Sequence, residues 1–400
     1  MSRILIDGRF IGVGESISRY TLELLSHILE LDKKNNYTLL IRPAGVDACG
    51  RSFDIEKLEL GNLIRNSELE IRNLQIKVLD IKHYSTAEQF GLLKFLNCGK
   101  YDLVHFPQFN HPTRYRGKFV VTIHDLILLN HAKANFIKKM AFVPVLKSAA
   151  RDSAAIITAS EETKREIIYT LRGREEKIHL IHHGIDHSKF NITAKSHREF
   201  LDKFCRENKI ENDYLLYVGA WKLHKNLLRS IHAYEKYVSE NEKFVHLVLV
   251  GKVDKREKAV IKAIEQCNNE AMKRRGKGSA IITAGEVKSD NDLAQIYAGA
   301  IAYVMPSLAE GFGWPPLEAM ACGTPVISSK ISCMPEILGD AVSYFDPLKV
   351  DDMADAIKKI ISDHNLRQKL IKLGLDQVKK YDWTETAKKT LEVYKEILEK

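Results

Sequence analysis

The stretch Glu310–Ile327 reads EGFGWPPLEAMACGTPVI and carries two carboxylates, Glu310 and Glu318, eight positions apart. A glycine turn between them leads into Pro315-Pro316, and proline suits a helix start because its missing N–H would be unpaired there anyway. The start of a helix presents free N–H groups and a partial positive charge, which attract anions such as phosphate. Because helical side chains lean toward the N-terminus, both carboxylates can face one pocket. The stretch therefore predicts a site that suits a sugar attached to a nucleotide diphosphate.

The whole of this stretch resembles, without a break, the Glu-x7-Glu signature of family 4 glycosyltransferases. These are retaining enzymes of the GT-B fold, so the resemblance implies an α/β protein in which two Rossmann-like domains with parallel sheets face each other across a cleft. It implies that Glu310 is catalytic, binding sugar hydroxyls and supporting positive charge at the ring, and that Glu318 holds the ribose. The backbone of Gly311, Phe312 and Gly313 would stabilise the leaving diphosphate. A buried turn with incidental acids is the alternative.

The length of 400 residues exceeds what one hydrophobic core usually serves, so two domains are expected. Strand-like and helix-like segments alternate along the chain, which indicates parallel sheets. Residues 181–187 resemble the family's interdomain linker, and the last helix resembles one that packs back on the first domain. We therefore predict an N-terminal, acceptor-side domain over 1–187, a nucleotide-sugar-binding domain over 188–380, and a returning helix over 381–400.

The expected strands are short, apolar and often β-branched. In the first half they are Arg3–Ile6, Thr38–Ile41, Leu103–His105, Val120–His124 and Ala155–Ala159. In the second half they are Tyr214–Val218, His246–Val250, Ala280–Thr283, Ala302–Met305 and Pro325–Ser328.

The chain has 45% hydrophobic residues but no apolar run near the ~20 residues of a membrane helix. Its N-terminus enters a strand-like segment without a signal-peptide core, so we expect a cytoplasmic protein. The net charge of +9 fits an anionic membrane face, because resembling bacterial enzymes act on lipid-linked acceptors, or it reflects solvated lysines. No stacking-aromatic motif of nucleic-acid modules is present, so no nucleic-acid partner is expected. Six scattered cysteines without a Cys-x-x-Cys pair indicate reduced thiols.

A second motif, Val218–Asn226, follows the first strand expected in the second half. Gly219 permits a tight strand-to-helix turn, and the motif resembles the family's diphosphate clamp, which Lys225 matches. The family's arginine is missing, because Ala220 stands at one of its possible positions and His224 at the other. Lys222 is a candidate for the second positive charge, although lysine lacks the bidentate fork of arginine.

The loop after the first expected strand resembles the family's first loop but departs from it. Ser16 and Ser18 stand where the family has two glycines, while Gly12 and Gly14 lie slightly upstream. These two glycines remain candidates for the backbone contact that the family makes here. The segment fails the Gly-x-Gly-x-x-Gly pattern because Ile17 occupies the third glycine position, which argues against a dinucleotide dehydrogenase.

Two further candidates come from other strand ends. His124 is the last residue of an expected strand of the first half, and open α/β sheets bind ligands beyond such strand ends. Its segment resembles Ile-His-Asp-Leu of mannosyltransferase-like family members, in which the histidine contacts the donor sugar and phosphate. A structural histidine is the alternative. Val287 matches a family residue whose backbone meets the nucleotide base. Ser160 is predicted to cap the helix that follows it.

Two patterns resemble metal sites. Asp290-Asn291-Asp292 has an Asp-x-Asp form, but it matches a helix start of the family, so capping by Ser289 or Asp290 is favoured. His182, His183 and His187 lie in the linker-like segment without a suitably spaced acidic partner. We therefore expect no metal and no other cofactor.

The segment at residues 136–147 mixes apolar and basic residues at near-helical spacing. It fits a core-facing helix with a lysine rim or an interfacial helix at a membrane.

Taken with the resemblance, these motifs imply retaining transfer of a hexose from a nucleotide-diphosphate sugar to a saccharide or polyprenyl-linked saccharide. The Ile-His-Asp-Leu likeness favours mannose from GDP-mannose, and the usual setting is the lipid-linked surface polysaccharide, such as O-antigen, of lipopolysaccharide. A UDP-sugar-dependent transferase, a glycogen-synthase-like polymerase and a non-catalytic nucleotide-binding subunit are the alternatives.

Overall fold

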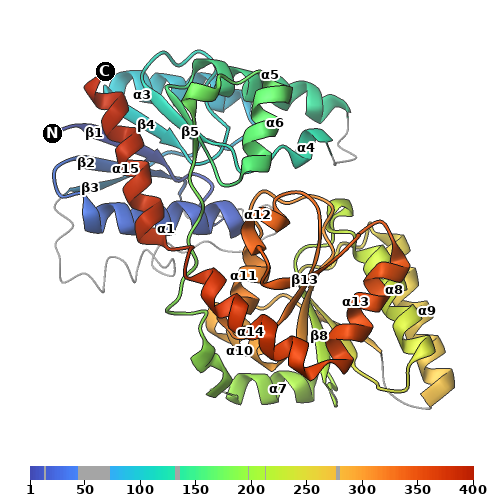
Figure 1. The fold of residues 1–400 in the computed structure, drawn as a ribbon. Helices are drawn as coiled ribbons and strands as arrows, with labels where there is room; N and C mark the ends of the chain where they lie inside the picture. The colour runs from blue at the N-terminus through green and yellow to red at the C-terminus, as the bar shows by residue number, and fades with distance from the viewer. Residues whose placement is uncertain (13–14, 44–72, 131–135, 197, 212, 276–279) are drawn as a thin grey trace. The chain divides into compact units, whose positions relative to one another are not determined.

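The computed structural model describes all residues except 13–14, 44–72, 131–135, 197, 212 and 276–279 (Figure 1). The chain divides into two compact units. The first unit comprises Met1–Leu129, Lys133–Gly184 and Asp382–Lys400, and the second comprises Asn130–Ala132 and Ile185–Tyr381. Both are α/β units with a parallel sheet, as the alternating pattern predicts.

The sheet of the first unit has seven strands in the order β3-β2-β1-β4-β5-β6-β7, all paired in parallel. The strands are β1 (Arg3–Asp7), β2 (Asn36–Ile41), β3 (Leu74–Val78), β4 (Leu103–Phe106), β5 (Phe119–Thr122), β6 (Ala155–Thr158) and β7 (Ile178–Leu180). The central strands are buried on both faces, which explains their nearly continuous apolar sequence. β3 is half exposed and alternating, and the sequence reasoning missed it together with the three-residue β7.

Helices cover this sheet on both faces (Figure 1). They are α1 (Glu15–Leu31), the π-helix η1 (Glu88–Leu92), α3 (Leu93–Gly99), α4 (Ile127–Asn130), α5 (Phe136–Asp152), α6 (Glu161–Leu171) and α15 (Trp383–Glu399), with the 3-10 turn η2 (Glu175–Lys177). The predicted cap of α6 is confirmed, since Ser160 Oγ accepts a hydrogen bond of 3.3 Å from the backbone N–H of Thr163.

The C-terminal helix α15 packs beside α1 within the first unit (Figure 1). The hydroxyl of Tyr394 lies 2.5 Å from Nδ1 of His105 on β4, and Lys118 Nζ donates to the carbonyl of Ile397 at 2.9 Å. The helix is anchored at its start because Gly184 lies against the backbone of Trp383, where a side chain would collide. The glycine of the linker-like segment is therefore required by close packing.

The second unit has a six-stranded parallel sheet in the order β10-β9-β8-β11-β12-β13. Its strands are β8 (Tyr214–Val218), β9 (His246–Val250), β10 (Ile281–Gly285), β11 (Ala302–Met305), β12 (Val326–Ser329) and β13 (Val342–Phe345). All except the last were expected from the sequence. β13 reads VSYF, and because its two central residues are polar or partly polar, its sequence does not differ from that of a loop.

The helices of the second unit also cover both sheet faces (Figure 1). They are α7 (Glu199–Glu207), α8 (Leu227–Glu240), α9 (Lys258–Arg275), α10 (Asp290–Gly299), α11 (Trp314–Ala321), α12 (Met334–Leu338), α13 (Val350–Ser362) and α14 (His364–Val378), with 3-10 turns η3 (Ile192–Ser196) and η4 (Leu223–Lys225). The main core lies between the sheet and α8, α9 and α13. In the described part of the chain, no helix is both long and apolar enough to cross a bilayer.

Each sheet has one point where the strand order reverses direction. In the first unit it lies between β1 and β4, and in the second between β8 and β11. Open parallel sheets bind ligands in the crevice beyond the carboxyl ends of the strands at such a point. The loops that leave these four strands are therefore the places to look for chemistry.

Candidate functional site

The strand-order switch point of the second unit brings together two motifs that lie 85 residues apart. Lys225 ends η4 in the loop after β8, and Glu310 lies in the loop after β11. Lys225 Nζ lies 2.7 Å from Glu310 Oε1, and the two side chains are 18% and 10% exposed. A charge-assisted hydrogen bond at this distance is short, and its partial burial shields it from solvent. The sequence singled out both residues without showing that they meet.

Asn226 ties these two loops together. It adopts the left-handed conformation (φ 56°), and its Nδ2 donates to the carbonyls of Pro306, at 3.1 Å, and Pro347, at 2.8 Å. The backbone N–H of Leu308 donates to the carbonyl of His224 at 2.6 Å. The two residues of the clamp motif therefore have different roles. Lys225 contacts the carboxylate of Glu310, and Asn226 holds in place the loop that carries Lys225.

A second clasp holds Glu310 itself. The hydroxyl of Ser332 accepts from the N–H of Glu310 at 3.2 Å and donates to its carbonyl at 3.0 Å. Cys333 Sγ lies 3.2 Å from the same carbonyl and 3.6 Å from that of Phe312. Ser332 has a positive φ of 57°, which is uncommon for a non-glycine residue. The turn before α12 thus fixes the backbone on which Glu310 stands, and the sequence reasoning missed both residues of this clasp.

The turn that follows Glu310 opens α11. Gly313 precedes the helix with φ of 89°, and a Cβ on it would lie 2.6 Å from Cε of the buried Met334. The positive φ therefore favours glycine there, while the contact is with the flexible end of the Met334 side chain. Trp314 is the first residue of the helix, so Pro315 stands second and not first as the sequence reasoning expected. The start of α11 thus lies where an anion cradle was predicted, although Pro315 and Pro316 contribute no N–H group to it.

Glu318 lies on α11 but is only 3% exposed. Its Oε2 accepts a hydrogen bond of 3.0 Å from the hydroxyl of Tyr297. The pKa of the Tyr303 hydroxyl lies well above its ordinary value. Burial is the largest cause, and the negative charges of Glu310 and Glu318 contribute to the rise. Both carboxylates therefore act electrostatically on one buried tyrosine hydroxyl. The role of Glu318 toward ribose stays a prediction.

The remaining residues predicted in the second unit occupy loops at the same sheet edge. Gly219 follows β8, and its φ of 154° lets its carbonyl lie against Gly251, where a Cβ would collide with it. Lys222 is exposed one turn before Lys225. Val287 is half buried in the loop after β10. This placement fits a ligand beyond the carboxyl ends of the strands but does not by itself assign their contacts.

His124, in the first unit, has both ring nitrogens engaged. Its Nε2 lies 2.8 Å from the carbonyl of Pro107, which can only accept, so Nε2 carries the proton. Burial lowers the pKa of His124 to about 4, so the ring is neutral near pH 7 and its Nδ1 accepts from Nε2 of His183 at 3.2 Å. The ring also packs edge-on against Tyr20 at 4.8 Å between centroids. A donor contact by His124 would require one of these bonds to be exchanged.

Two family models match this chain. The model of glycosyl transferases group 1 matches residues 202–376, and that of glycosyltransferase family 4 matches residues 68–189. Both models describe glycosyltransferases, and this chain is a glycosyltransferase. Its catalytic class is therefore glycosyl transfer, and its two parallel-sheet, Rossmann-like units are those of the GT-B fold.

Two curated relatives of this glycosyltransferase come from Escherichia coli. O-antigen chain mannosyltransferase B is 28% identical over 294 residues, which is 73% of this chain and 74% of that protein. Serotype-specific mannosyltransferase WbdA is 28% identical over 286 residues, 70% of this chain but only 34% of that longer protein. Among solved structures, sucrose-phosphate synthase from Thermosynechococcus elongatus covers 99% of both chains with a TM-score of 0.71 and 18% identity, a likeness of fold alone.

The first-loop glycines of this glycosyltransferase are only partly described. Gly12 has φ of 81°, and its N–H donates to Ser18 Oγ at 3.2 Å. Gly14 lies outside the described residues. Ser18 stands where the family has a glycine, and here it serves to hold the Gly12 loop against the start of α1. The departure from the family pattern therefore has a structural use within this chain.

The metal-like patterns of the sequence form no cluster in the described part of the chain. Ser289, one of the two expected caps of α10, accepts from the N–H of Asp292 at 3.2 Å. Asp290 Oδ2 lies 3.4 Å from Lys189 Nζ. His187 Nε2 lies 3.1 Å from the carbonyl of Tyr381. The Asp-x-Asp pattern is thus used for capping and ion pairing, while independence from metal stays a prediction.

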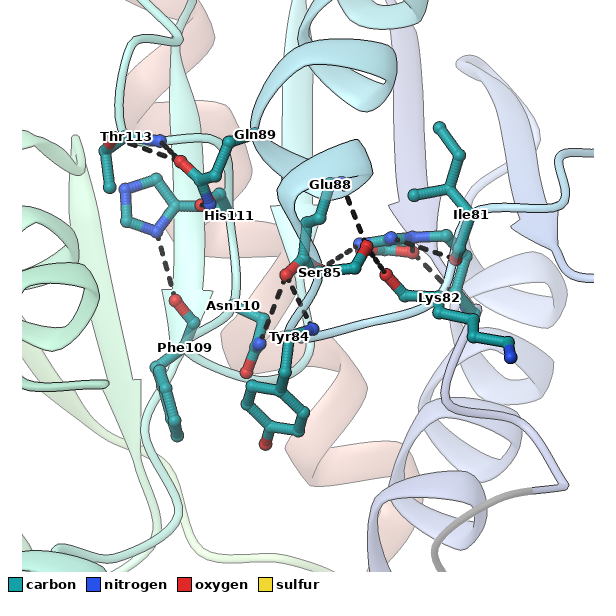
Figure 2. A network of polar contacts seen from close by, with 12 residues as sticks. Ile81, Lys82, Tyr84, Ser85, Glu88, Gln89, Phe109, Asn110, His111 and Thr113 are labelled. Carbon is teal, nitrogen blue, oxygen red and sulfur yellow. Dashed lines mark hydrogen bonds and ion pairs between the residues drawn. The ribbon is translucent and has the colours of Figure 1, made fainter. Parts of the chain in front are cut away.

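The first unit has a buried ion cluster at its own switch point, which the sequence reasoning did not anticipate. Arg9 is fully buried between two carboxylates, with its NH2 nitrogen 2.7 Å from Asp7 Oδ2 and 2.8 Å from Glu88 Oε1. Glu88 opens the π-helix η1, and it lies at the centre of the polar network in Figure 2. The sequence showed Asp7-Gly8-Arg9 after the first strand, but nothing in it pointed to Glu88.

Proposed function

We propose that this glycosyltransferase moves a hexose, mannose from GDP-mannose, to a saccharide or polyprenyl-linked saccharide acceptor, with retention of anomeric configuration and without a metal ion. The observation that carries the proposal is the Lys225–Glu310 pair at the switch point of the second unit. The cation and the carboxylate neutralise each other there, next to the start of α11.

The pair has the chemistry that a sugar nucleotide requires. A diphosphate would compete with Glu310 for the ammonium of Lys225, because phosphate and carboxylate both accept from it. Sugar hydroxyls would then donate to the released carboxylate of Glu310, which also stabilises positive charge at the anomeric carbon. Preorganised charges of this kind are usually the largest single contribution to rate. The N–H groups of Gly311, Phe312 and Gly313 and the cation of Lys222 would complete the binding of the leaving group.

The choice of mannose rests on the two relatives from Escherichia coli, whose names describe mannosyltransferases, the first of them for O-antigen chains, and on the Ile-His-Asp-Leu likeness at His124. The same relatives support assembly of a lipid-linked surface polysaccharide as the setting. Such an acceptor would place the enzyme at the cytoplasmic membrane surface, and the net charge of +9 supports peripheral contact with anionic lipids.

A thermal-shift panel tests the donor assignment. The protein is heated with GDP, UDP or ADP and the matching sugar nucleotides, with a chelator and without added metal. A ligand that binds only the folded state raises the apparent melting temperature. We expect a GDP-selective and GDP-mannose-selective shift that survives the chelator. A UDP-selective shift would overturn the mannose assignment, and no shift with any nucleotide would favour a non-catalytic subunit.

A further inference from the structure

We propose that Tyr84 and Asn110, at the strand-order switch point of the first unit, form a subsite that stacks and hydrogen-bonds a neutral hexopyranose of the acceptor. This inference rests on the proposed transfer function and adds a ligand site in the first unit. Asn110 follows β4, while Asp7 is the last residue of β1 and Arg9 follows that strand, so the carboxyl ends of both switch-point strands contribute to this place.

Tyr84 is held in an unusual, exposed conformation. Its φ is 57°, and its side chain is 46% exposed. A bulky residue with positive φ is an outlier that the surrounding structure must stabilise. Here the stabilising contact is Glu88, whose Oε2 accepts from the N–H of Tyr84 at 2.9 Å. Arg9 binds the other oxygen of the same carboxylate at 2.8 Å. The buried ion cluster therefore fixes the position of an exposed aromatic ring.

The ring of Tyr84 belongs to an aromatic cluster on the surface of the first unit. It packs edge-on against Phe142 of α5 at 4.6 Å between centroids and lies 6.2 Å from Phe109. Phe10 and His83 extend the cluster, with their rings stacked at 4.1 Å. An exposed aromatic ring backed by other rings offers a flat apolar face of the kind that covers the C–H face of a pyranose.

Asn110 supplies a polar atom with no partner among the described residues. Its side chain is 2% exposed, and its Nδ2 lies 3.4 Å from the same Glu88 Oε2 that binds the N–H of Tyr84. Its Oδ1 has no hydrogen-bond partner. A buried acceptor left unpaired is costly, so a hydroxyl that reaches it is bound favourably. Figure 2 shows the side chains of Asn110, Tyr84 and Phe109 pointing to the same side of the network.

The charges around Tyr84 select a neutral ligand that donates hydrogen bonds. Burial first, then the negative charges of Glu88 and Asp125, raise the pKa of the Tyr84 hydroxyl to about 12. Both charged influences are carboxylates, which repel a phosphorylated sugar and accept from neutral hydroxyls. Asp125 directly follows His124, so the subsite lies beside the residue expected to meet the donor sugar.

Saturation-transfer NMR tests the subsite without any donor, using the full-length protein. The probes are the methyl α-glycosides of mannose, glucose, galactose and N-acetylglucosamine, with mannose 6-phosphate as the anionic comparator. We expect at least one methyl glycoside to bind, with strongest saturation on one face of its ring, and mannose 6-phosphate to bind at least tenfold more weakly. Failure of all four glycosides to bind, or preferential binding of the phosphate, would overturn the proposal.

Tyr84→Gly is the decisive variant, because glycine suits the positive φ and removes only the ring. We expect the Kd of the bound glycoside to rise at least tenfold, and that in Asn110→Ala at least fivefold. Tyr169→Ala removes a ring that is 81% exposed on α6 and should leave the Kd unchanged. Unchanged Kd in folded Tyr84→Gly would remove Tyr84 from the site. GDP-induced thermal shifts of these variants should equal that of the wild type. The thermal shift therefore tests the proposed donor, and the glycoside Kd tests the subsite, so one proposal can fail without the other.

Discussion

The two units have ion pairs at equivalent places, the strand-order switch points of their sheets, but these ion pairs differ in solvent exposure. At the switch point of the second unit, the Lys225–Glu310 pair is partly exposed, at 18% and 10%, and each partner can be approached by a ligand. At the switch point of the first unit, Arg9 is 0% exposed between two buried carboxylates, and a ligand cannot compete for it. A partly exposed pair is available for exchange, whereas a buried cluster is a framework that orients other groups.

Because of this difference, mutations at the two switch points should affect different properties of the protein. Breaking a pair that exchanges with ligand should reduce turnover and leave the fold intact. Breaking a buried cluster should destabilise its own unit first, because it leaves uncompensated charge in the interior. Four variants test this contrast.

Arg9→Met should have the largest effect and act on stability. Two carboxylates, Asp7 and Glu88, would remain buried without their cation, at a cost of about 3–5 kcal/mol in the free energy of unfolding. Burial already raises the pKa of Glu88, opposed by Arg9, and loss of Arg9 would raise it further. A raised pKa favours the protonated acid in the folded state, so the variant should regain part of its stability as the pH falls from 7 to 5. Urea unfolding at both pH values measures this, and equal stability of variant and wild type would contradict the framework role.

Glu310→Gln should reduce kcat about 10²–10³-fold, or ~3–4 kcal/mol, while the fold is retained and GDP affinity, freed from competition for Lys225, does not fall. Glutamine keeps the shape of the side chain but loses the negative charge that would face the sugar ring. Steady-state transfer kinetics and GDP titration separate the two effects. As a matched control, Glu270→Gln removes a carboxylate that pairs with Lys273 on the exposed face of α9 and should not alter kcat. Undiminished turnover in Glu310→Gln would eliminate this residue from the mechanism.

Acid should weaken the first unit through His105. This histidine is fully buried between Thr122 and Tyr394, and burial lowers its pKa to about 3. Since its pKa in the unfolded chain is ~6.5, the unfolded state binds the proton first as the pH falls. The stability contribution present above pH 6.5 is therefore lost at lower pH, by about 2–3 kcal/mol between pH 6.5 and 4.5.

His105→Gln keeps hydrogen-bonding groups at this position but does not titrate. Its free energy of unfolding should fall less steeply than that of the wild type over this pH interval. Parallel pH dependence of the two proteins, measured by urea unfolding, would show that other groups control the acid response.

Ser332→Ala should have the smallest effect and act on catalysis through position. It removes the hydroxyl that bonds both the N–H and the carbonyl of Glu310. We expect kcat to fall about 5–20-fold, or ~1–2 kcal/mol, with the KM for donor changed less. Ser362→Ala, which removes an exposed hydroxyl at the end of α13, serves as control. A rise in KM alone would mean that the clasp serves binding and not the transition state.

The sequence determined the fold class and singled out Glu310 and Lys225, two residues that lie in contact in the structure. The Glu310–Ile327 stretch, the alternating elements and the clamp lysine are local patterns, and they predicted the GT-B fold, most of the strands and the residues Glu310 and Lys225. Local patterns succeed there because a glycine turn, a proline-led helix start and a buried parallel strand each impose their own residue types. The short or half-exposed β3, β7 and β13 impose no such pattern, and they were missed.

Only the tertiary structure decided which distant residues meet. Glu88 and Arg9 are 79 positions apart, Ser332 and Glu310 are 22 apart, and His124 turned out to be engaged on both nitrogens. The residues next to a side chain in the sequence do not show which distant residue it will contact, because that depends on the order of the strands. The Arg9–Glu88 contact and the Ser332–Glu310 contact therefore could not be predicted from the sequence. The sequence by itself specified which elements form, and the order of strands in each sheet specified which loops lie together at its switch point.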